Sequence, residues 1–256
     1  MNFATVNGIS LRYDLRPGDG VPLVLLHEMG GAIESFDLVV RALPGRTVLR
    51  LDLRGFGLSE KPAGPLSMEN FVDDVIALMD HLDIAAAHLA GCAVGGGVAL
   101  AAAARLGGRA ASLTAMAPAT GVPPERRDGL LKLADMLEEN GVRGFLEADT
   151  IPKAWPGDHF DRGSEGFAIF LATQLGTSPA TLARTYRMLA DLDLAPAFAA
   201  ITCPTTLIAG QYDIARPPVL IETIARQIPG ARAVTVASGH FMALQNPDIV
   251  AGLLVP

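Results

Sequence analysis

Short apolar runs alternate with stretches in helical spacing along residues 1–120, and this alternation restricts the fold more than any other feature. The runs that predict strands lie at 3–6, 9–14, 21–27, 47–52, 86–90 and 110–116. Helices are predicted between them at 35–43, from the capping residue Ser67 to Leu82, and at 94–106. The first two runs flank Asn7-Gly8, which predicts a hairpin. Because parallel strands need a long crossover, usually a helix, the remaining strands are predicted to form a parallel sheet.

The pattern changes after Pro118. From about residue 122 to 196 there is no strand-like run, and helices are predicted at 125–139, 141–148, 165–175 and 179–189. Strands return at 205–209 and 233–236, with helices at 218–227 and 248–254. We therefore expect an α/β fold with a doubly wound, mostly parallel eight-stranded sheet. Its core domain comprises residues 1–120 and 197–256, and residues 121–196 form a helical cap.

Composition narrows the class of partner. Half of the residues are hydrophobic, the net charge is −7, and no Lys/Arg run exceeds two residues, which speaks against a nucleic-acid partner. Residues 84–104 carry no Asp, Glu, Lys or Arg, but their glycines favour a strand, a turn and a buried helix over a membrane span. The two cysteines suggest no disulfide framework, and the N-terminal residues lack the features of a secretory signal. We expect a cytoplasmic protein with no membrane partner.

Polar and glycine-rich segments follow several of the predicted strands. They read LHEMGG (26–31), DLRGFGLSEKP (52–62), GCAVGG (91–96), AGQYDIARPP (209–218) and SGHFMALQNPD (238–248). Open α/β sheets bind ligands at the carboxyl ends of their strands, so these segments are predicted to meet in one site.

These segments, in this order, resemble the α/β-hydrolase family over essentially the full chain, and within it the small capped lactonases and esterases related to 3-oxoadipate enol-lactonase. The resemblance implies that His240 is the general base and that Asp213 orients it. It also implies an oxyanion hole made by the backbone N–H groups of Met29 and Val94. We expect the substrate pocket to include Gly30, Trp155 and Phe241, and His27 to pack behind the glycine loop.

The segment Gly91-Cys92-Ala93-Val94-Gly95 departs from the family pattern Gly-x-Ser-x-Gly. Ala93 occupies the nucleophile position, and its methyl group cannot form a covalent acyl intermediate. Cys92 lies one position early, and we expect its sulfur to be buried beside the strand. Two interpretations of Ala93 remain: an engineered Ser→Ala change, or a natural residue in a site whose chemistry other groups carry out.

Glu28 is a second departure, because many relatives have glycine at this position. A side chain here can point into the pocket and place a carboxylate close to the oxyanion hole and His240. An anion there opposes ester hydrolysis unless it is protonated or acts as a base. The alternative is a solvated loop acid or a partner for a helix N-terminus. Two coordinated departures favour a natural repurposing of the site.

The first functional hypothesis is an enol-lactonase-like hydrolase that acts on a small lactone, ester or activated acyl compound. The second is a cofactor-free lyase or decarboxylase that uses Glu28 and His240, and the third is a non-catalytic ligand-binding homologue. We expect no cofactor and no metal, because no metal-ligand motif or dinucleotide fingerprint occurs in the sequence. A homodimer is left open. An acidic substrate would need a pocket cation, and the candidates are Arg54, Arg126, Arg127, Arg143, Arg184 and Arg187.

Overall fold

The computed structural model of the chain describes residues 2–254, which form one eight-stranded sheet in the order β1-β2-β4-β3-β5-β6-β7-β8. The strands are β1 (Asn2–Val6), β2 (Ile9–Arg16), β3 (Asp19–Leu26), β4 (Arg46–Leu51), β5 (Ala87–Cys92), β6 (Ala110–Met116), β7 (Thr205–Gly210) and β8 (Arg232–Val236). The pairs β1–β2 and β2–β4 are antiparallel, and all other pairs are parallel. The predicted doubly wound, mostly parallel eight-stranded sheet is therefore confirmed.

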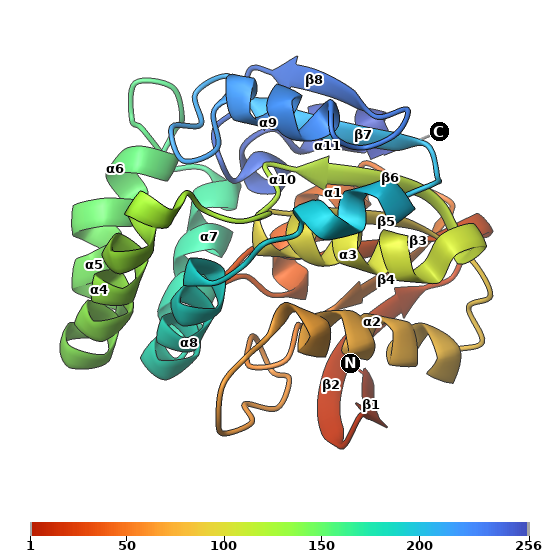
Figure 1. Cartoon of the computed structure of the whole chain (residues 1–256), viewed down its shortest axis with the longest axis horizontal. Helices are drawn as coiled ribbons and strands as arrows, with labels where there is room; N and C mark the ends of the chain where they lie inside the picture. Colours follow the sequence, from red (N-terminus) through yellow and green to blue (C-terminus); the bar gives the residue numbers. More distant parts are fainter. Residues whose placement is uncertain (1, 255–256) are drawn as a thin grey trace.

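Helices cover both faces of the sheet (Figure 1). They are α1 (Asp37–Arg41), α2 (Met68–His81), α3 (Val94–Leu106), α9 (Pro218–Ala225), α10 (Met242–Gln245) and α11 (Pro247–Leu254). Successive residues of β3 belong to opposite cores: Val24 and Leu26 pack with α2 and α3, whereas Leu23 and Leu25 pack with α1 and α11. This alternation is the period of two that a strand buried on both faces requires.

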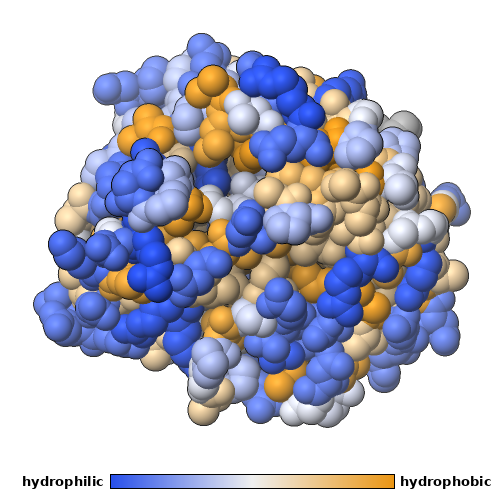
Figure 2. All heavy atoms as spheres, in the orientation of Figure 1, coloured by the Kyte–Doolittle hydropathy of each residue, from blue (hydrophilic) through white to orange (hydrophobic). Residues whose placement is uncertain are grey.

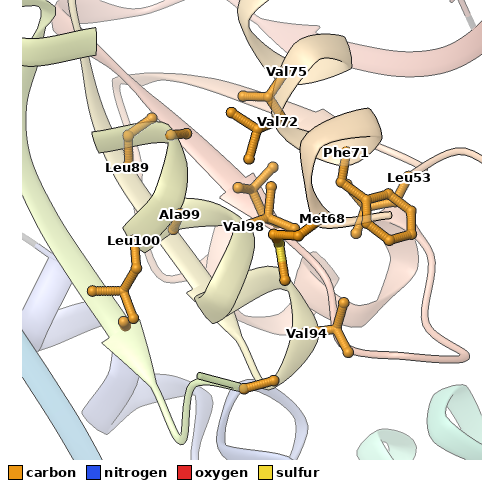
Figure 3. Close-up of a cluster of buried hydrophobic side chains, with 14 of the residues drawn as sticks. Leu53, Met68, Phe71, Val72, Val75, Leu89, Val94, Val98, Ala99 and Leu100 are labelled. Carbon is orange, nitrogen blue, oxygen red and sulfur yellow. The ribbon is translucent and has the colours of Figure 1, made fainter. Parts of the chain in front are cut away.

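The packing of α2 against α3 supports the start of α3, where the site lies. Ser67 begins α2 as predicted, since its side chain accepts a hydrogen bond from the backbone N–H of Asn70. Figure 3 shows Met68 and Val72 of α2 pointing toward Val98 of α3, with the side chain of Val94 at the edge of the cluster. The first turn of α3 is thus held on a tightly packed apolar base.

A group of helices lies between β6 and β7 in sequence and beyond the carboxyl ends of the parallel strands in space (Figure 1). They are α4 (Pro124–Asn140), α5 (Val142–Phe145), α6 (Ile151–Ala154), α7 (Glu165–Gly176) and α8 (Pro179–Ala190). We call these helices the cap. Its division from the core at residues 121 and 196 stays a prediction, and residues 1, 255 and 256 of the predicted core segments lie outside the described residues.

Several local predictions differ from the structure. The helix predicted at 141–148 consists of α5 and the start of a π-helical turn at Leu146–Thr150, and α6, which follows this turn, was not predicted. The short helix α10 and a 3-10 helix at Ala195–Ala200 were not predicted.

Figure 2 shows weakly hydrophobic residues facing the viewer over the 195–200 segment, where Ala195, Ala199 and Ala200 are exposed. Within residues 2–254, no helix combines the length and the hydropathy that a membrane span requires.

Candidate active site

The turn between β5 and α3 is a sharp elbow. Ala93 stands at its apex with φ 51° and ψ −112°, a conformation that costs a side-chain-bearing residue roughly 1–3 kcal/mol. The flanking glycines are required by close backbone approach, because a Cβ on Gly91 would lie 2.2 Å from Gly95 O and one on Gly95 would lie 2.2 Å from Leu26 O. Met116 O accepts a hydrogen bond from Ala93 N at 2.9 Å, which fixes the apex to β6. The elbow is therefore complete except for a nucleophile.

Asp213 and His240, which follow β7 and β8, form a hydrogen-bonded pair with a distance of 2.7 Å between Oδ2 and Nδ1. The other oxygen of Asp213 accepts hydrogen bonds from the backbone N–H groups of Ala215 and Arg216, both at 2.9 Å. Burial raises the pKa of Asp213, but the His240 imidazole and these N–H groups outweigh it and hold the pKa below its usual value. Because Nδ1 of His240 is engaged, Nε2 is the nitrogen left for proton transfer.

A cavity of about 210 Å³ separates this pair from the cap. The predicted site residues Glu28, Met29, Ala93, Val94, His240 and Phe241 all contribute to its wall. Val94 is the first residue of α3, so its N–H has no partner within the helix. The cap closes the cavity with a largely apolar surface from Phe145, Ala154, Leu182, Tyr186 and Leu189. A cavity of this size suits a small ligand, since pockets for drug-sized molecules measure roughly 300–1,000 Å³.

Glu28 is 2% exposed, so the alternative of a solvated loop acid is wrong. Its Oε1 accepts a hydrogen bond from the buried hydroxyl of Ser35 at 2.8 Å, and no hydrogen bond from the described residues reaches its Oε2. Burial raises the pKa of Glu28, while attraction to His27 and His240 and the Ser35 hydrogen bond only partly oppose this. The structure therefore brings a carboxyl group that favours its neutral form next to Ala93 and His240.

Gly30 and Trp155, which we predicted to line the pocket, lie outside the cavity wall, whereas Phe241 is part of it. Gln174 covers Gly30, since a Cβ on Gly30 would lie 2.3 Å from the Gln174 side-chain oxygen. Trp155 is 1% exposed and stacks on Phe170 with ring centroids 5.6 Å apart. Its indole thus belongs to the packing of the cap.

His27 and Cys92 have the structural positions that the sequence predicts. His27 is fully buried behind the glycine loop, where its Nδ1 lies 2.7 Å from Glu28 O and its Nε2 accepts a hydrogen bond from Leu53 N at 2.9 Å. Cys92 is 1% exposed, and burial raises the pKa of its thiol. Cys92 is therefore a poor replacement for the missing nucleophile.

None of the arginines proposed as pocket cations is found in the cavity wall. Most are engaged elsewhere: Arg54 with Asp74, Arg127 with Asp191, Arg143 with Glu147, Arg184 with the carbonyls of Pro62 and Gly64, and Arg187 with Asp135 and Glu138. The cations that reach the cavity are Lys153 and Arg216, which the sequence analysis missed. The available signal was the position of Arg216, three residues after Asp213 in the loop that follows β7.

Comparison with known proteins identifies the family. A sequence profile described as "alpha/beta hydrolase fold" matches residues 21–140. The AB hydrolase superfamily protein YisY of Bacillus subtilis is 30% identical over 255 aligned positions, which cover 93% of this chain and 91% of that protein. The putative carbamate hydrolase RutD of Azorhizobium caulinodans is 27% identical over 265 aligned positions, with 100% and 97% coverage.

A solved structure supports the same assignment. The crystal structure of the enol-lactonase from Burkholderia xenovorans LB400 matches with a TM-score of 0.90 and 29% identity, covering 99% of this chain and 98% of that one. One curated relative is matched only in part: the chain spans 32% of the dihydrolipoyllysine-residue acetyltransferase component of the acetoin cleaving system of Pseudomonas putida, at 42% identity over 118 residues. The elbow, the sheet order and these matches together show that the chain belongs to the α/β-hydrolase family and is related to its enol-lactonases.

Proposed function

We propose that the protein hydrolyses a small activated acyl compound, such as a lactone, an ester or a carbamate, by direct attack of water. One observation carries the proposal: His240, which is hydrogen-bonded to Asp213, lines the same cavity as Ala93. The residues that match the base and the acid of a hydrolase, His240 and Asp213, are present, whereas Ala93 stands at the position of the nucleophile. Relatives named as an enol-lactonase and a putative carbamate hydrolase support this reaction class.

In the proposed reaction, His240 Nε2 removes a proton from water as the water oxygen bonds to the acyl carbon. Asp213 keeps the imidazole in the required tautomer and stabilises the imidazolium that forms. The N–H groups of Met29 and Val94 stabilise the developing oxyanion, each contributing about 3 kcal/mol by comparison with other oxyanion holes. The tetrahedral adduct then expels the alcohol, enol or amine, which takes the proton from His240.

The raised pKa of Glu28 fits this reaction, because a neutral carboxyl group does not repel the oxyanion. Ser35 Oγ accepts a hydrogen bond from Ala32 N and donates to Glu28 Oε1, which leaves Oε2 to carry the carboxyl proton. We propose that Glu28 lends this proton to the oxyanion as the adduct forms and takes it back when the carbonyl re-forms, while the leaving group takes its proton from His240. The same position also favours the second candidate function, a lyase in which ionised Glu28 removes a substrate proton.

Ala93→Ser tests whether the site works without a nucleophile. We expect a fluorophosphonate probe to label the variant at residue 93 and to leave the native protein unlabelled, because only the hydroxyl can attack phosphorus. On a panel of lactones, activated esters and carbamates, we expect the native protein's preferred substrate to be turned over more slowly by the variant. A gain of about a hundredfold on that substrate would contradict the proposal and identify a disarmed serine hydrolase. His240→Ala serves as the inactive control.

A further inference from the structure

Arg216 brings a guanidinium group into the wall of the catalytic cavity, which it shares with His240, Ala93 and Glu28. Its backbone N–H donates to Asp213 Oδ1 at 2.9 Å, so the loop that orients the catalytic pair also fixes the Cα of Arg216. Pro217 and Pro218 follow directly and restrict the backbone on the other side. The guanidinium is therefore carried by a rigid part of the core rather than by the cap.

The side chain of Arg216 differs from those of three arginines that are largely buried in the core, and among the described residues it shares its lack of an ion pair with Arg46 at the start of β4. Arg12, Arg50 and Arg54 each form ion pairs with one or more carboxylates. Arg216 forms no ion pair or side-chain hydrogen bond with the described residues, although burial lowers its pKa and nearby Arg126 adds to this effect. A partly buried guanidinium without an anion is costly unless a ligand supplies one.

The other ionisable groups of the cavity do not supply that anion. Lys153 and Asp149 form an ion pair with each other on the cap side. Glu28 is on the opposite loop and favours its neutral form, and Asp213 already accepts hydrogen bonds from His240 and two backbone N–H groups. Arg216 is therefore the cation of the cavity wall whose side chain has no hydrogen-bonded anionic partner among the described residues, since the charge of Asp213 acts on it without a direct contact.

We propose that Arg216 binds a carboxylate of the substrate, so that the protein acts on acyl compounds that also carry a free carboxylate. The inference rests on the proposed hydrolytic function and names its substrate class. The planar guanidinium offers two parallel N–H donors to a carboxylate, and this geometry orients the substrate as well as holding it. A cavity of about 210 Å³ favours a short dicarboxylate derivative over a long-chain ester.

A competing role for Arg216 is electrostatic support of Asp213, whose negative charge attracts it. The two roles differ in what they do to the reaction. A guanidinium that binds the substrate affects KM for carboxylate-bearing substrates alone. One that supports Asp213 would lower kcat for every substrate, because the His240–Asp213 pair acts on all of them.

The test compares 4-nitrophenyl hydrogen glutarate with its neutral methyl ester, using the native protein, Arg216→Gln, Arg216→Lys and the exposed control Arg226→Gln. We expect Arg216→Gln to raise KM for the carboxylate substrate at least tenfold while kcat/KM for the methyl ester changes less than threefold. Arg216→Lys, which keeps the charge but loses the planar fork, should lie between. Equal losses on both esters would overturn the proposal in favour of support for Asp213.

Glutarate binding measured by calorimetry separates this inference from the hydrolytic proposal, because it needs no turnover. We expect Arg216→Gln to weaken binding at least tenfold and Arg226→Gln to leave it unchanged. If binding responds in this way but neither ester is hydrolysed, the substrate class stands and the hydrolytic function fails. Absence of glutarate binding to the native protein, or equal binding by native protein and Arg216→Gln, would overturn the role of Arg216.

Discussion

The molecule buries carboxylates in two regions, and it treats them differently. Beneath the antiparallel edge of the sheet, Asp74 accepts two hydrogen bonds of 2.6 Å from Arg54, and fully buried Asp52 lies 3.3 Å from Arg12. In the cavity beside Ala93, Glu28 is equally buried and has no arginine or lysine partner among the described residues. In the first region, ion pairs offset the free-energy cost of burying a carboxylate. In the second, burial raises the pKa of the carboxyl group instead.

The difference between the two regions indicates that the ion-paired carboxylates serve stability and that Glu28 serves function. A buried ion pair fixes the packing around it, and removal of one partner leaves an uncompensated charge. Burial without such a partner instead raises the pKa of the carboxyl group, which favours the protonated form that can act as an acid. The comparison therefore predicts that substitutions at Glu28 change chemistry, whereas substitutions at Asp74 change folding.

The largest expected effect is loss of catalysis when the cavity loses its base. His240→Ala should lower kcat/KM on the preferred substrate by roughly 10²–10⁴-fold, the usual contribution of a positioned general base. Thermal stability should fall modestly, because buried Asp213 loses its imidazole partner but keeps its two backbone N–H donors and the sheet stays intact. His81→Ala, at the exposed end of α2, is the matched control. Full activity of His240→Ala would show that the cavity is not the reactive region.

The next effect concerns folding. Asp74→Ala leaves the Arg54 guanidinium buried without its carboxylate, and we expect the free energy of unfolding to fall by about 3–5 kcal/mol. Asp73→Ala, which breaks only an exposed pair with Arg105, should cost about 1 kcal/mol or less. Urea unfolding of both variants measures the difference. An equal, small loss for both would erase the contrast between the two regions.

The sequence predicts the positions of those site residues that directly follow a parallel strand. Asp213, His240 and Ala93 each lie at the carboxyl end of a parallel strand, so the order of strands brings them together. This reasoning does not extend to Trp155, a cap residue whose side-chain direction depends on the packing of the cap. Arg216 was missed although it lies in the loop that follows β7. Residue type alone does not distinguish an indole that lines a cavity from one that stacks on Phe170.

The sequence also did not predict which charged residues form buried ion pairs. Arg54 was one of six arginines considered as a pocket cation, and the sequence did not rank them. Its partner Asp74 is located on α2, and only the packing of that helix brings the two within 2.6 Å. For Glu28 the sequence left a pocket position and a solvated position open, because the choice depends on whether a neighbouring element, here the segment that carries Ser35, covers the side chain.

A smaller effect sharpens the comparison at Glu28 itself. Glu28→Gln keeps the shape and an N–H donor but loses the transferable proton, so we expect kcat to fall by roughly tenfold if Glu28 acts as a neutral acid. In the lyase alternative, loss of the carboxylate base should lower kcat by several orders of magnitude. Steady-state kinetics on the preferred substrate separate the two. An unchanged kcat would remove Glu28 from the mechanism.

The smallest expected effect is on the pH dependence of stability, and its sign distinguishes the carboxyl groups. The pKa of Glu28 is raised by folding, so its stabilising contribution is complete below its unfolded pKa and is lost as pH rises through the folded value. The pKa of Asp213 is lowered, so its contribution is present above the unfolded value and is lost as pH falls. The native protein should therefore lose stability relative to Glu28→Gln as pH rises above about 4.5, the usual range for glutamate.

Urea unfolding of the native protein, Glu28→Gln and Asp213→Asn across pH 3–8 measures both signs. Asp213→Asn should differ from the native protein in the opposite direction, with a deficit that grows as pH rises through the acidic range. The contrast depends on which form of each carboxyl group the fold prefers, so a surface acid shows neither trend. If stability differences for Glu28→Gln followed the direction expected for Asp213, Glu28 would be ionised in the folded protein and the lyase assignment would gain support over the hydrolase.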